Sequence, residues 1–214
     1  MADLAAAARI LEGALGARLR EGFPIAPLTS FRIGGPAALF VEAEDDRDLA
    51  AVAEATDVAG VPVTVIGKGS NVLVSDGGFP GIVVRLGRGF RWAGREGDRL
   101  AAGGAMPLPA LAGVALQHGL GGLEFGVAIP ATLGGAVRMN AGAHGRSMSE
   151  VVERIEVYLF GSAERHTISG HEAGFAYRRS ALPADGVVVG ATVRLRAAEE
   201  PAIRALMEEA REWR

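Results

Sequence analysis

Two clusters of glycine carry the residues of this sequence that are best suited to bind a ligand. In the first, Gly67-Lys68-Gly69-Ser70-Asn71, two glycines one residue apart let successive backbone N–H groups turn toward one point. Lys68 adds positive charge, and Ser70 and Asn71 add side-chain donors. Donors gathered in this way suit a pyrophosphate, although an ordinary tight hairpin fits the same spacing equally well.

The 67–71 loop matches neither of two common phosphate-binding motifs. A Walker motif needs Gly where Pro62 stands and Ser or Thr where Gly69 stands. A dinucleotide fingerprint needs a third glycine where Val72 stands, followed by a helix, whereas residues typical of a strand continue to Val74. Any phosphate site here is therefore of another kind.

The second cluster runs from Gly126 to Gly142. Small residues on both sides of Pro130 leave room for a flat ligand to lie against the backbone, and Thr132 and Asn140 can satisfy its polar edge. A purely structural interpretation is equally consistent with this segment, because Gly134-Gly135 can simply pack the start of a helix closely against a sheet.

The composition is that of a globular protein, since 49% of the 214 residues are hydrophobic and 22% are charged. A formal net charge of −3, with no dominant run of Lys or Arg, argues against a nucleic-acid partner. The absence of cysteine excludes disulfides, thiolate-bound metals and a cysteine nucleophile. No apolar run reaches the roughly 18 residues of a membrane span, and the N-terminus does not read as a signal peptide. We therefore expect a cytoplasmic protein without a membrane partner.

Hydrophobic periodicity and turn residues predict an α+β organisation. An N-terminal helix is expected over residues 1–20. A first lobe, residues 21–86, is expected to contain strands at 31–33, 38–43, 61–66, 72–74 and 81–86 and a helix at 45–59. Asp45 and Asp48 open that helix, where acidic side chains complement the positive end of the helix dipole. The 67–71 loop would then join two strands.

A second lobe, residues 87–198, is predicted to contain a mostly antiparallel sheet. Its expected elements are strands at 100–103, 153–160, 166–168 and 186–195, a helix at 108–118 and a glycine-rich segment at 119–145. An amphipathic helix over 199–214 completes the pattern.

Six motifs, in this order and at this spacing, resemble a known family across about residues 25–196. They are Phe31-Arg32-Ile33-Gly34-Gly35-Pro36-Ala37, Gly67-Lys68-Gly69-Ser70-Asn71-Val72-Leu73-Val74-Ser75-Asp76, Gly122-Leu123-Glu124-Phe125, Ile129-Pro130, Gly134-Gly135-Ala136-Val137-Arg138-Met139-Asn140-Ala141-Gly142 and Tyr177-Arg178-Arg179-Ser180. The sequence resembles the MurB family, the UDP-N-acetylenolpyruvoylglucosamine reductases.

The resemblance implies an α+β, two-lobed FAD-binding domain of the PCMH/vanillyl-alcohol-oxidase-like type, with FAD held non-covalently. It implies that the flavin pyrophosphate lies on the 67–71 loop and the isoalloxazine lies near residues 129–142. The cofactor-binding residues that it implies are Gly67, Lys68, Gly69, Ser70, Asn71, Val72, Gly104, Ile129, Pro130, Ala131, Thr132, Gly134, Gly135, Asn140, Ala141, Gly142 and Val188. No metal site is expected.

The resemblance also implies an activity. In the family, NADPH reduces FAD, and hydride then passes to the enolpyruvyl ether of a UDP-sugar in peptidoglycan precursor synthesis. Arg178 matches the family's catalytic arginine, whose planar cation could hold the substrate carboxylate or offset developing negative charge, and Tyr177 would position it. Without the resemblance, Arg178 and Arg179 are better interpreted as surface charges.

The sequence departs from the family in two ways. Ala131 stands where the family usually has Gly, and Val127-Ala128 stand where Ala-Gly is usual. The family chain continues beyond the helix at 199–214 into a substrate domain with a proton-donating serine, which neither Ser147 nor Ser180 matches. We therefore expect poor reductase activity from this chain alone, because general acid catalysis and substrate orientation would both be lost.

The functional alternatives also remain open. The leading hypothesis is a flavoprotein related to UDP-N-acetylmuramate dehydrogenase, and a split reductase with a separate substrate domain is a variant of it. The other is a non-catalytic relative that binds a nucleotide or a partner protein, with helix 199–214 and Trp213 as a docking surface. His144 is the first histidine to test for a chemical role, and no histidine lies in the 67–71 loop to form a histidyl-flavin bond.

Overall fold

The computed structural model describes residues 2–212, and these residues form two compact units. The first unit holds the chain up to Gly89 together with Tyr158–His166 and Pro183–Val187, and the second holds the remaining described residues. The sequence placed a single boundary between residues 86 and 87. A single boundary does not assign the two later segments to the first unit. Hydrophobic alternation identifies a strand, but it does not show which hydrophobic core each end of the strand packs against.

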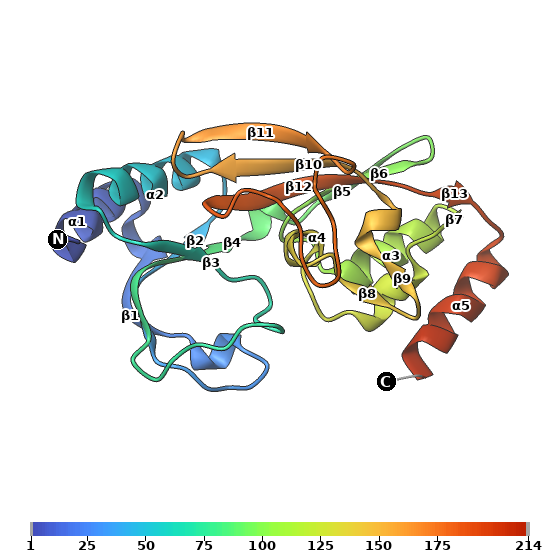
Figure 1. Ribbon diagram of the computed structural model, residues 1–214, viewed down its shortest axis with the longest axis horizontal. Helices are drawn as coiled ribbons and strands as arrows, with labels where there is room; N and C mark the ends of the chain where they lie inside the picture. The colour runs from blue at the N-terminus through green and yellow to red at the C-terminus, as the bar shows by residue number, and fades with distance from the viewer. Residues whose placement is uncertain (1, 213–214) are drawn as a thin grey trace. The chain divides into compact units, whose positions relative to one another are not determined.

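A four-stranded sheet forms the centre of the first unit. Its order is β1-β2-β4-β3, with Leu19–Pro24 (β1), Pro36–Ala43 (β2), Val63–Val65 (β3) and Phe79–Leu86 (β4). Strand β1 is antiparallel to β2, whereas β2, β4 and β3 are parallel. Parallel strands need a crossover connection, and helix α2 (Asp46–Ala59) supplies it between β2 and β3. Helix α1 (Leu4–Leu15) lies beside α2 (Figure 1).

Helix α2 begins and ends within a residue of the predicted bounds. The Asp45 carboxylate accepts hydrogen bonds from the N–H groups of Arg47 and Asp48, at 2.9 and 3.1 Å, and so caps the first turn. Gly60 ends the helix in the left-handed region, with φ of +61°, and its N–H bonds the Thr56 carbonyl. The crossover is therefore defined by local residues at both ends.

The core of the first unit reaches the start of the 67–71 loop. Phe40 on β2, Val83 on β4 and Ile66 are buried in one hydrophobic cluster. The Ile66 N–H also donates to the Val84 carbonyl at 2.9 Å, which keeps the chain on the sheet one residue beyond β3. The loop thus begins from a residue that is fixed by both packing and hydrogen bonding.

A five-stranded sheet with the order β11-β10-β12-β6-β5 follows later in the chain. Its strands are Ala93–Glu96 (β5), Arg99–Gly103 (β6), Val152–Leu159 (β10), Glu164–Ser169 (β11) and Gly186–Arg194 (β12). The β12–β6 and β6–β5 pairs are antiparallel, and Figure 1 shows β10, β11 and β12 side by side. The predicted antiparallel pairing is confirmed for the two pairs whose register is defined.

Short elements and three α-helices complete the second unit. They are α3 (Leu108–Gln117), β7 (Leu120–Gly121), η4 (Glu124–Ala128), α4 (Leu133–Arg138), β8 (Gly142–Ala143), β9 (Arg146–Ser147), η5 (Met148–Glu150), β13 (Arg196–Ala197) and α5 (Glu200–Glu212). Helix α5 packs against η4 and α3 and buries Ile203, Met207 and Ala210. Within residues 2–212, no helix has the length and apolar character needed to cross a bilayer.

Two predicted strands are wrong, and one predicted helix is too long. The segments at 31–33 and 72–74 are loops instead of strands, and Phe31, Ile33 and Leu73 are exposed. Helix α1 ends at Leu15, because Gly16 turns the chain with φ of +54°, and residues expected in the helix begin β1. Apolar residues in 31–33 and 72–74 indicated strands, but the chain makes specific loop contacts in both segments.

Tyr158 on β10 is a buried polar residue without a partner for its hydroxyl group. The residue is 3% exposed, and its hydroxyl makes no hydrogen bond within the described residues. Its ring meets that of Phe160 edge-on, with centroids 6.0 Å apart. Burial raises the pKa of the Tyr158 hydroxyl, and the negative charge of Asp46 adds to this effect.

Replacing Tyr158 with Phe is expected to leave the free energy of unfolding at pH 7 unchanged or to raise it, because an unpaired buried hydroxyl costs about 1–3 kcal/mol. In the wild type, stability should fall as the pH rises above the ordinary tyrosine value of 10.0, because the unfolded side chain ionises first. The variant should lose this part of the pH dependence. Urea unfolding between pH 7 and pH 11 measures both effects, with the exposed Tyr177→Phe as control. Marked destabilisation of Tyr158→Phe at pH 7 would contradict the expectation.

Candidate functional site

The 67–71 loop presents backbone donors that the protein itself does not use. Within residues 2–212, no hydrogen bond to a protein acceptor takes up the N–H groups of Gly67, Lys68, Gly69, Ser70 or Asn71. The side chains of Lys68 and Asn71 are exposed, and that of Ser70 is half-buried. Free N–H groups in a tight loop beside a cation form an arrangement that favours an anion.

Gly69 fixes the shape of this loop. Its φ is +61°, and a β-carbon added there would lie 2.1 Å from the carbonyl oxygen of Leu28. The Gly69 carbonyl accepts a hydrogen bond from the Ser30 N–H at 3.1 Å. The loop is therefore held against the segment at 28–30 by a backbone approach that only glycine allows.

The same two segments touch again a few residues further along. The Gly35 N–H donates to the Ser75 carbonyl at 2.8 Å. At Gly78, with φ of +78°, an added β-carbon would lie 1.9 Å from the Pro36 carbonyl oxygen. The sequence motifs at 31–37 and 67–76 are thus two sides of one loop pair, residues 28–36 and 67–78. This pairing is the physical reason why neither side forms the predicted strand.

In the second unit, the structure brings together three residues that the sequence assigned to one site. The Gly104 N–H donates to Val189 at 2.7 Å, and the Gly134 N–H donates to Gly104 at 2.9 Å. A β-carbon at Gly134 would lie 2.8 Å from the Val188 carbonyl oxygen. Gly134 therefore packs the start of α4 against the ends of β6 and β12, as the structural interpretation of the second glycine cluster requires.

Most N–H groups of the segment at 129–135 donate within the protein, in contrast to those of the 67–71 loop. The N–H groups of Ile129 and Ala131 donate to Gly126 and Ile129, and Thr132 caps α4 by accepting from the Gly135 N–H at 3.3 Å. The Ala131 carbonyl accepts from Leu108 at 2.9 Å. Ala131 does not adopt a positive φ, so its methyl group causes no left-handed strain. This segment, which includes Pro130, offers a ligand small side chains on a fixed backbone.

Residues 140–142 turn the chain away from α4. Asn140 has φ of +40°, and the Ala141 N–H donates to the Ala136 carbonyl at 2.8 Å. A β-carbon at Gly142 would lie 2.4 Å from the Arg146 carbonyl oxygen, so this glycine permits the β8–β9 hairpin. The Asn140 amide is bonded on both sides: Nδ2 donates to the Ala176 carbonyl at 3.1 Å, and Oδ1 accepts from the Ser149 N–H at 2.9 Å.

Tyr177 and Arg178 lie at the tip of a tight turn. Ala176 and Arg179 exchange backbone hydrogen bonds of 3.0 and 3.2 Å, which leaves Tyr177 and Arg178 as the two central residues. Tyr177 is 90% exposed, and Arg178 has φ of +58°. The Arg178 guanidinium carbon lies 5.9 Å from the Tyr177 ring centroid, within cation–π range. The arginine is thus presented as an accessible cation beside an aromatic ring.

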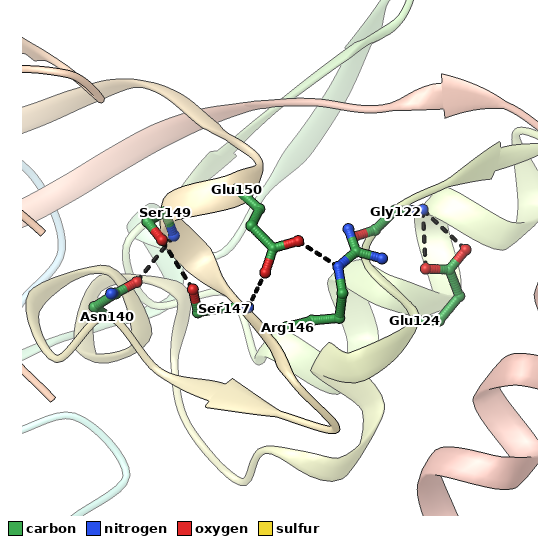
Figure 2. A network of polar contacts seen from close by, with 7 residues as sticks. All are labelled: Gly122, Glu124, Asn140, Arg146, Ser147, Ser149 and Glu150. Atoms are coloured by element: carbon green, nitrogen blue, oxygen red, sulfur yellow. Dashed lines mark hydrogen bonds and ion pairs between the residues drawn. The ribbon is translucent and has the colours of Figure 1, made fainter. Parts of the chain in front are cut away.

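A polar network connects the surroundings of Asn140 to η4 (Figure 2). Ser147 and Glu150 form a capping box at η5, and Glu150 pairs with Arg146. The Arg146 guanidinium donates to the Gly122 carbonyl at 3.4 Å, and the buried Glu124 carboxylate accepts from the Gly122 N–H. No role for these side chains was predicted from the sequence, although Ser147 followed by Glu150 three residues later is a capping-box signal.

The histidine singled out for testing lies at the tip of the β8–β9 hairpin. His144 has φ of +53°, and its Nε2 lies 3.1 Å from the Ala210 carbonyl oxygen near the end of α5.

Ser180 likewise contacts backbone, since its hydroxyl donates to the Arg138 carbonyl at 2.8 Å. Among the described residues, His, Asp and Glu side chains form no group of three that could hold a metal ion. Trp213, proposed for docking, lies outside the described residues.

Comparisons with known proteins fit this arrangement. A family described as the FAD binding domain matches residues 37–169, which contain both glycine clusters. The UDP-N-acetylenolpyruvoylglucosamine reductase of Methylorubrum extorquens is 43% identical over 195 residues, covering 91% of this chain and 62% of that protein. The crystal structure of the corresponding reductase (MurB) from Thermus caldophilus has a TM-score of 0.81 and 34% identity, covering 92% of this chain and 70% of that chain.

More distant structures share the fold alone. The BBE-like 1 protein of Physcomitrella patens has a TM-score of 0.64 at 16% identity, covering 89% of this chain and 44% of that chain. The predicted α+β fold of the PCMH/vanillyl-alcohol-oxidase-like type is confirmed by these similarities. The chain spans 62% of the length of the Methylorubrum extorquens reductase, which is less than two thirds.

Gly69→Ala is expected to destabilise the protein more than Gly97→Ala does. Both glycines have φ of +61°, but an added β-carbon meets nothing within 4 Å at Gly97 and lies 2.1 Å from Leu28 at Gly69. The left-handed conformation costs both variants about 1–2 kcal/mol. The Gly69 variant should lose a further ~1–3 kcal/mol, because the loop pair must separate. Urea unfolding of both variants measures the difference, and equal losses would show that the close approach contributes nothing.

Proposed function

The chain belongs to the family of FAD-binding domains, and from this premise we propose that its two glycine clusters hold FAD non-covalently. The diphosphate would be held by Gly67, Lys68, Gly69, Ser70, Asn71 and Val72. The flavin ring system would be held by the segment at 129–142 with Gly104 and Val188. The matched region, residues 37–169, includes both clusters.

The observation that carries this proposal is the set of unused N–H groups at 67–71. A loop that served only as a hairpin would pair its backbone groups across the turn, as Ala176 and Arg179 do. Here the N–H groups of residues 67–71 donate to no acceptor in the described chain, although Gly69 holds the backbone in one conformation. A diphosphate supplies several acceptor oxygens, and bonds to charged acceptors are stronger than neutral ones.

The second cluster suits the other end of the cofactor. Its N–H groups at Ile129, Ala131 and Gly134 are used within the protein, so this backbone is rigid and offers few polar donors. A flat, largely apolar ring system needs surface contact more than it needs hydrogen bonds. The two clusters therefore complement the two chemically different ends of one cofactor.

FAD, when bound, supplies hydride chemistry, and the chain's own residues supply binding and charge. The exposed guanidinium of Arg178 suits a carboxylate, because its planar fork matches two oxygens at once. Tyr177 lies beside it, with its ring centroid 5.9 Å from the guanidinium carbon, and is proposed to position it. We assign to Arg178 the binding of a substrate carboxylate and the stabilisation of negative charge that develops during reduction.

The activity proposed is that of the similar reductases: NADPH-dependent reduction of UDP-N-acetylenolpyruvoylglucosamine to UDP-N-acetylmuramate. The support is the 43% identity over 195 residues with a protein of that name. This chain spans 62% of that protein, so the proton donor and the groups that grip the UDP-sugar are proposed to come from a region outside the matched one. General acid catalysis and orientation are each worth orders of magnitude, so the chain alone should be a slow reductase.

A comparison of flavins tests the diphosphate site. FAD should bind about 100-fold more tightly than riboflavin, because two charge-assisted hydrogen bonds to the diphosphate contribute about 3 kcal/mol. Titration of the purified protein, followed by flavin fluorescence, measures both dissociation constants. Gly69→Ala should weaken FAD binding while affecting riboflavin binding much less. If FAD and riboflavin bind equally well, the 67–71 loop does not hold a diphosphate.

Arg178→Ala should reduce kcat/KM for NADPH consumption with the enolpyruvyl UDP-sugar by about 100-fold, the scale of losing one charge-stabilising group. The neighbouring Arg179→Ala is the matched control and should change the rate less than about threefold, within the usual range for exposed surface substitutions. Both variants should retain the FAD affinity of the wild type. Equal losses in the two variants would mean that the turn, and not the Arg178 side chain, matters for the reaction.

A further inference from the structure

The turn that carries Arg178 needs external support to hold one conformation. It belongs to no helix or strand and lies in the connection between β11 and β12. A left-handed residue other than glycine is disfavoured, and Arg178 adopts φ of +58° there. Its central residues are exposed, so packing within the turn contributes little. The side chains that tie this turn to the rest of the unit therefore decide how well the arginine is placed.

Among the described residues, the side chains of Asn140, Ser180 and Arg138 make hydrogen bonds that connect residues 176–182 to the end of α4. Asn140 Nδ2 donates to the Ala176 carbonyl at 3.1 Å. Ser180 Oγ donates to the Arg138 carbonyl at 2.8 Å, and the Arg138 guanidinium donates to the Leu182 carbonyl at 2.9 Å. Of the bonds named here, the one from Asn140 reaches a residue of the turn itself. The Ala176 carbonyl that receives it also accepts the N–H of Arg179, so this bond acts directly on the closure of the turn.

The orientation of the Asn140 amide is fixed by its two partners. Oδ1 accepts from the Ser149 N–H at 2.9 Å, and Nδ2 faces the Ala176 carbonyl, which can only accept. If the amide were flipped, Nδ2 would face the Ser149 N–H, donor against donor, and Oδ1 would face the Ala176 carbonyl, acceptor against acceptor. Ser149 is in turn placed by η5 and its capping box, the network shown in Figure 2. Asn140 therefore connects η5, which its capping box stabilises, to the turn at 176–179.

We propose that Asn140 is a positioning residue, which sets the position of Arg178 relative to the segment at 129–142 by holding the Ala176 carbonyl. The role of Arg178 in binding a carboxylate rests on the proposed function. The mechanical part, that Asn140 holds the turn closed, does not. Asn140 belongs to the second glycine cluster, so one amide joins the surface proposed for the flavin ring to the cation proposed for the substrate.

Asn140→Asp is the most informative substitution. Aspartate has nearly the same shape and keeps an oxygen for the Ser149 N–H, but it replaces the donor to Ala176 with an oxygen that repels the carbonyl. Ser149→Ala is the matched control, because the Ser149 hydroxyl contacts Ser147 and the backbone N–H to Asn140 remains. Urea unfolding should show that both variants are folded.

Limited trypsin digestion measures how often the turn opens, because trypsin cleaves after Arg178 and Arg179. Cleavage of a briefly opened segment follows the population of the open form. Asn140→Asp should raise cleavage at these two positions about tenfold, while cleavage at the exposed Arg95 stays unchanged and serves as the internal reference. Ser149→Ala should match the wild type. Unchanged cleavage at Arg178 and Arg179 in Asn140→Asp would overturn the proposal, as would an equal increase at Arg95.

A double-mutant cycle separates positioning from a general structural effect. The measured quantity is the affinity of the FAD-loaded protein for the enolpyruvyl UDP-sugar, followed by the change in flavin absorbance. Asn140→Asp should weaken this affinity about tenfold in the wild type and have no further effect in Arg178→Ala, because the two residues act through one contact. Additive losses would overturn the proposal. If the wild type binds FAD but no UDP-sugar, the sugar-gripping region proposed above is required for binding, and the trypsin result alone decides the role of Asn140.

Discussion

The space beside Gly69 is too small for any side chain, since an added β-carbon would lie 2.1 Å from the Leu28 carbonyl oxygen. The loop pair, residues 28–36 and 67–78, exists because glycines allow this approach and a similar one at Gly78. The contact fixes the curvature of the 67–71 loop from the outside, so its inner N–H groups need no partner within the protein. The proposed anion site is therefore a consequence of how two backbones meet, and its side chains add charge to a shape already determined.

The two glycine clusters use the same residue for opposite purposes. In the first, glycine leaves backbone donors unsatisfied and held in one conformation, which suits a charged group with many acceptors. In the second, Gly134 permits hydrogen bonds that satisfy the backbone internally, which leaves a rigid surface of small residues. The two clusters look similar in the sequence. Nothing in the sequence indicates that the first would leave its backbone N–H groups available to a ligand and that the second would use them within the protein. That difference depends on which carbonyl groups lie nearby, and those carbonyls belong to distant segments.

Local signals explain which elements could be predicted from the sequence. Helix α2 was predictable because Asp45 and Gly60 define its ends through neighbouring residues. The segments at 31–33 and 72–74 were predicted as strands and are loops, because their conformation is set by each other and not by their own apolar residues. The candidate site residues were identified by resemblance, and the structure gathers Gly104, Gly134 and Val188 in one place. The roles of Arg138 and Arg146 were missed because each donates to a backbone carbonyl far from it in sequence, whereas Glu124 accepts from an N–H only two residues away.

The left-handed arginine at the tip of the 176–179 turn limits how this position can change. Glycine or asparagine would suit the backbone at 178 better and would relieve strain, but neither carries a cation. Selection for stability alone and selection for charge therefore oppose each other at this residue. A library of variants selected only for thermal stability should enrich glycine or asparagine at position 178, and the positive charge would be lost. A selection that also requires anion binding should retain arginine at 178, with the stabilising substitutions at other positions.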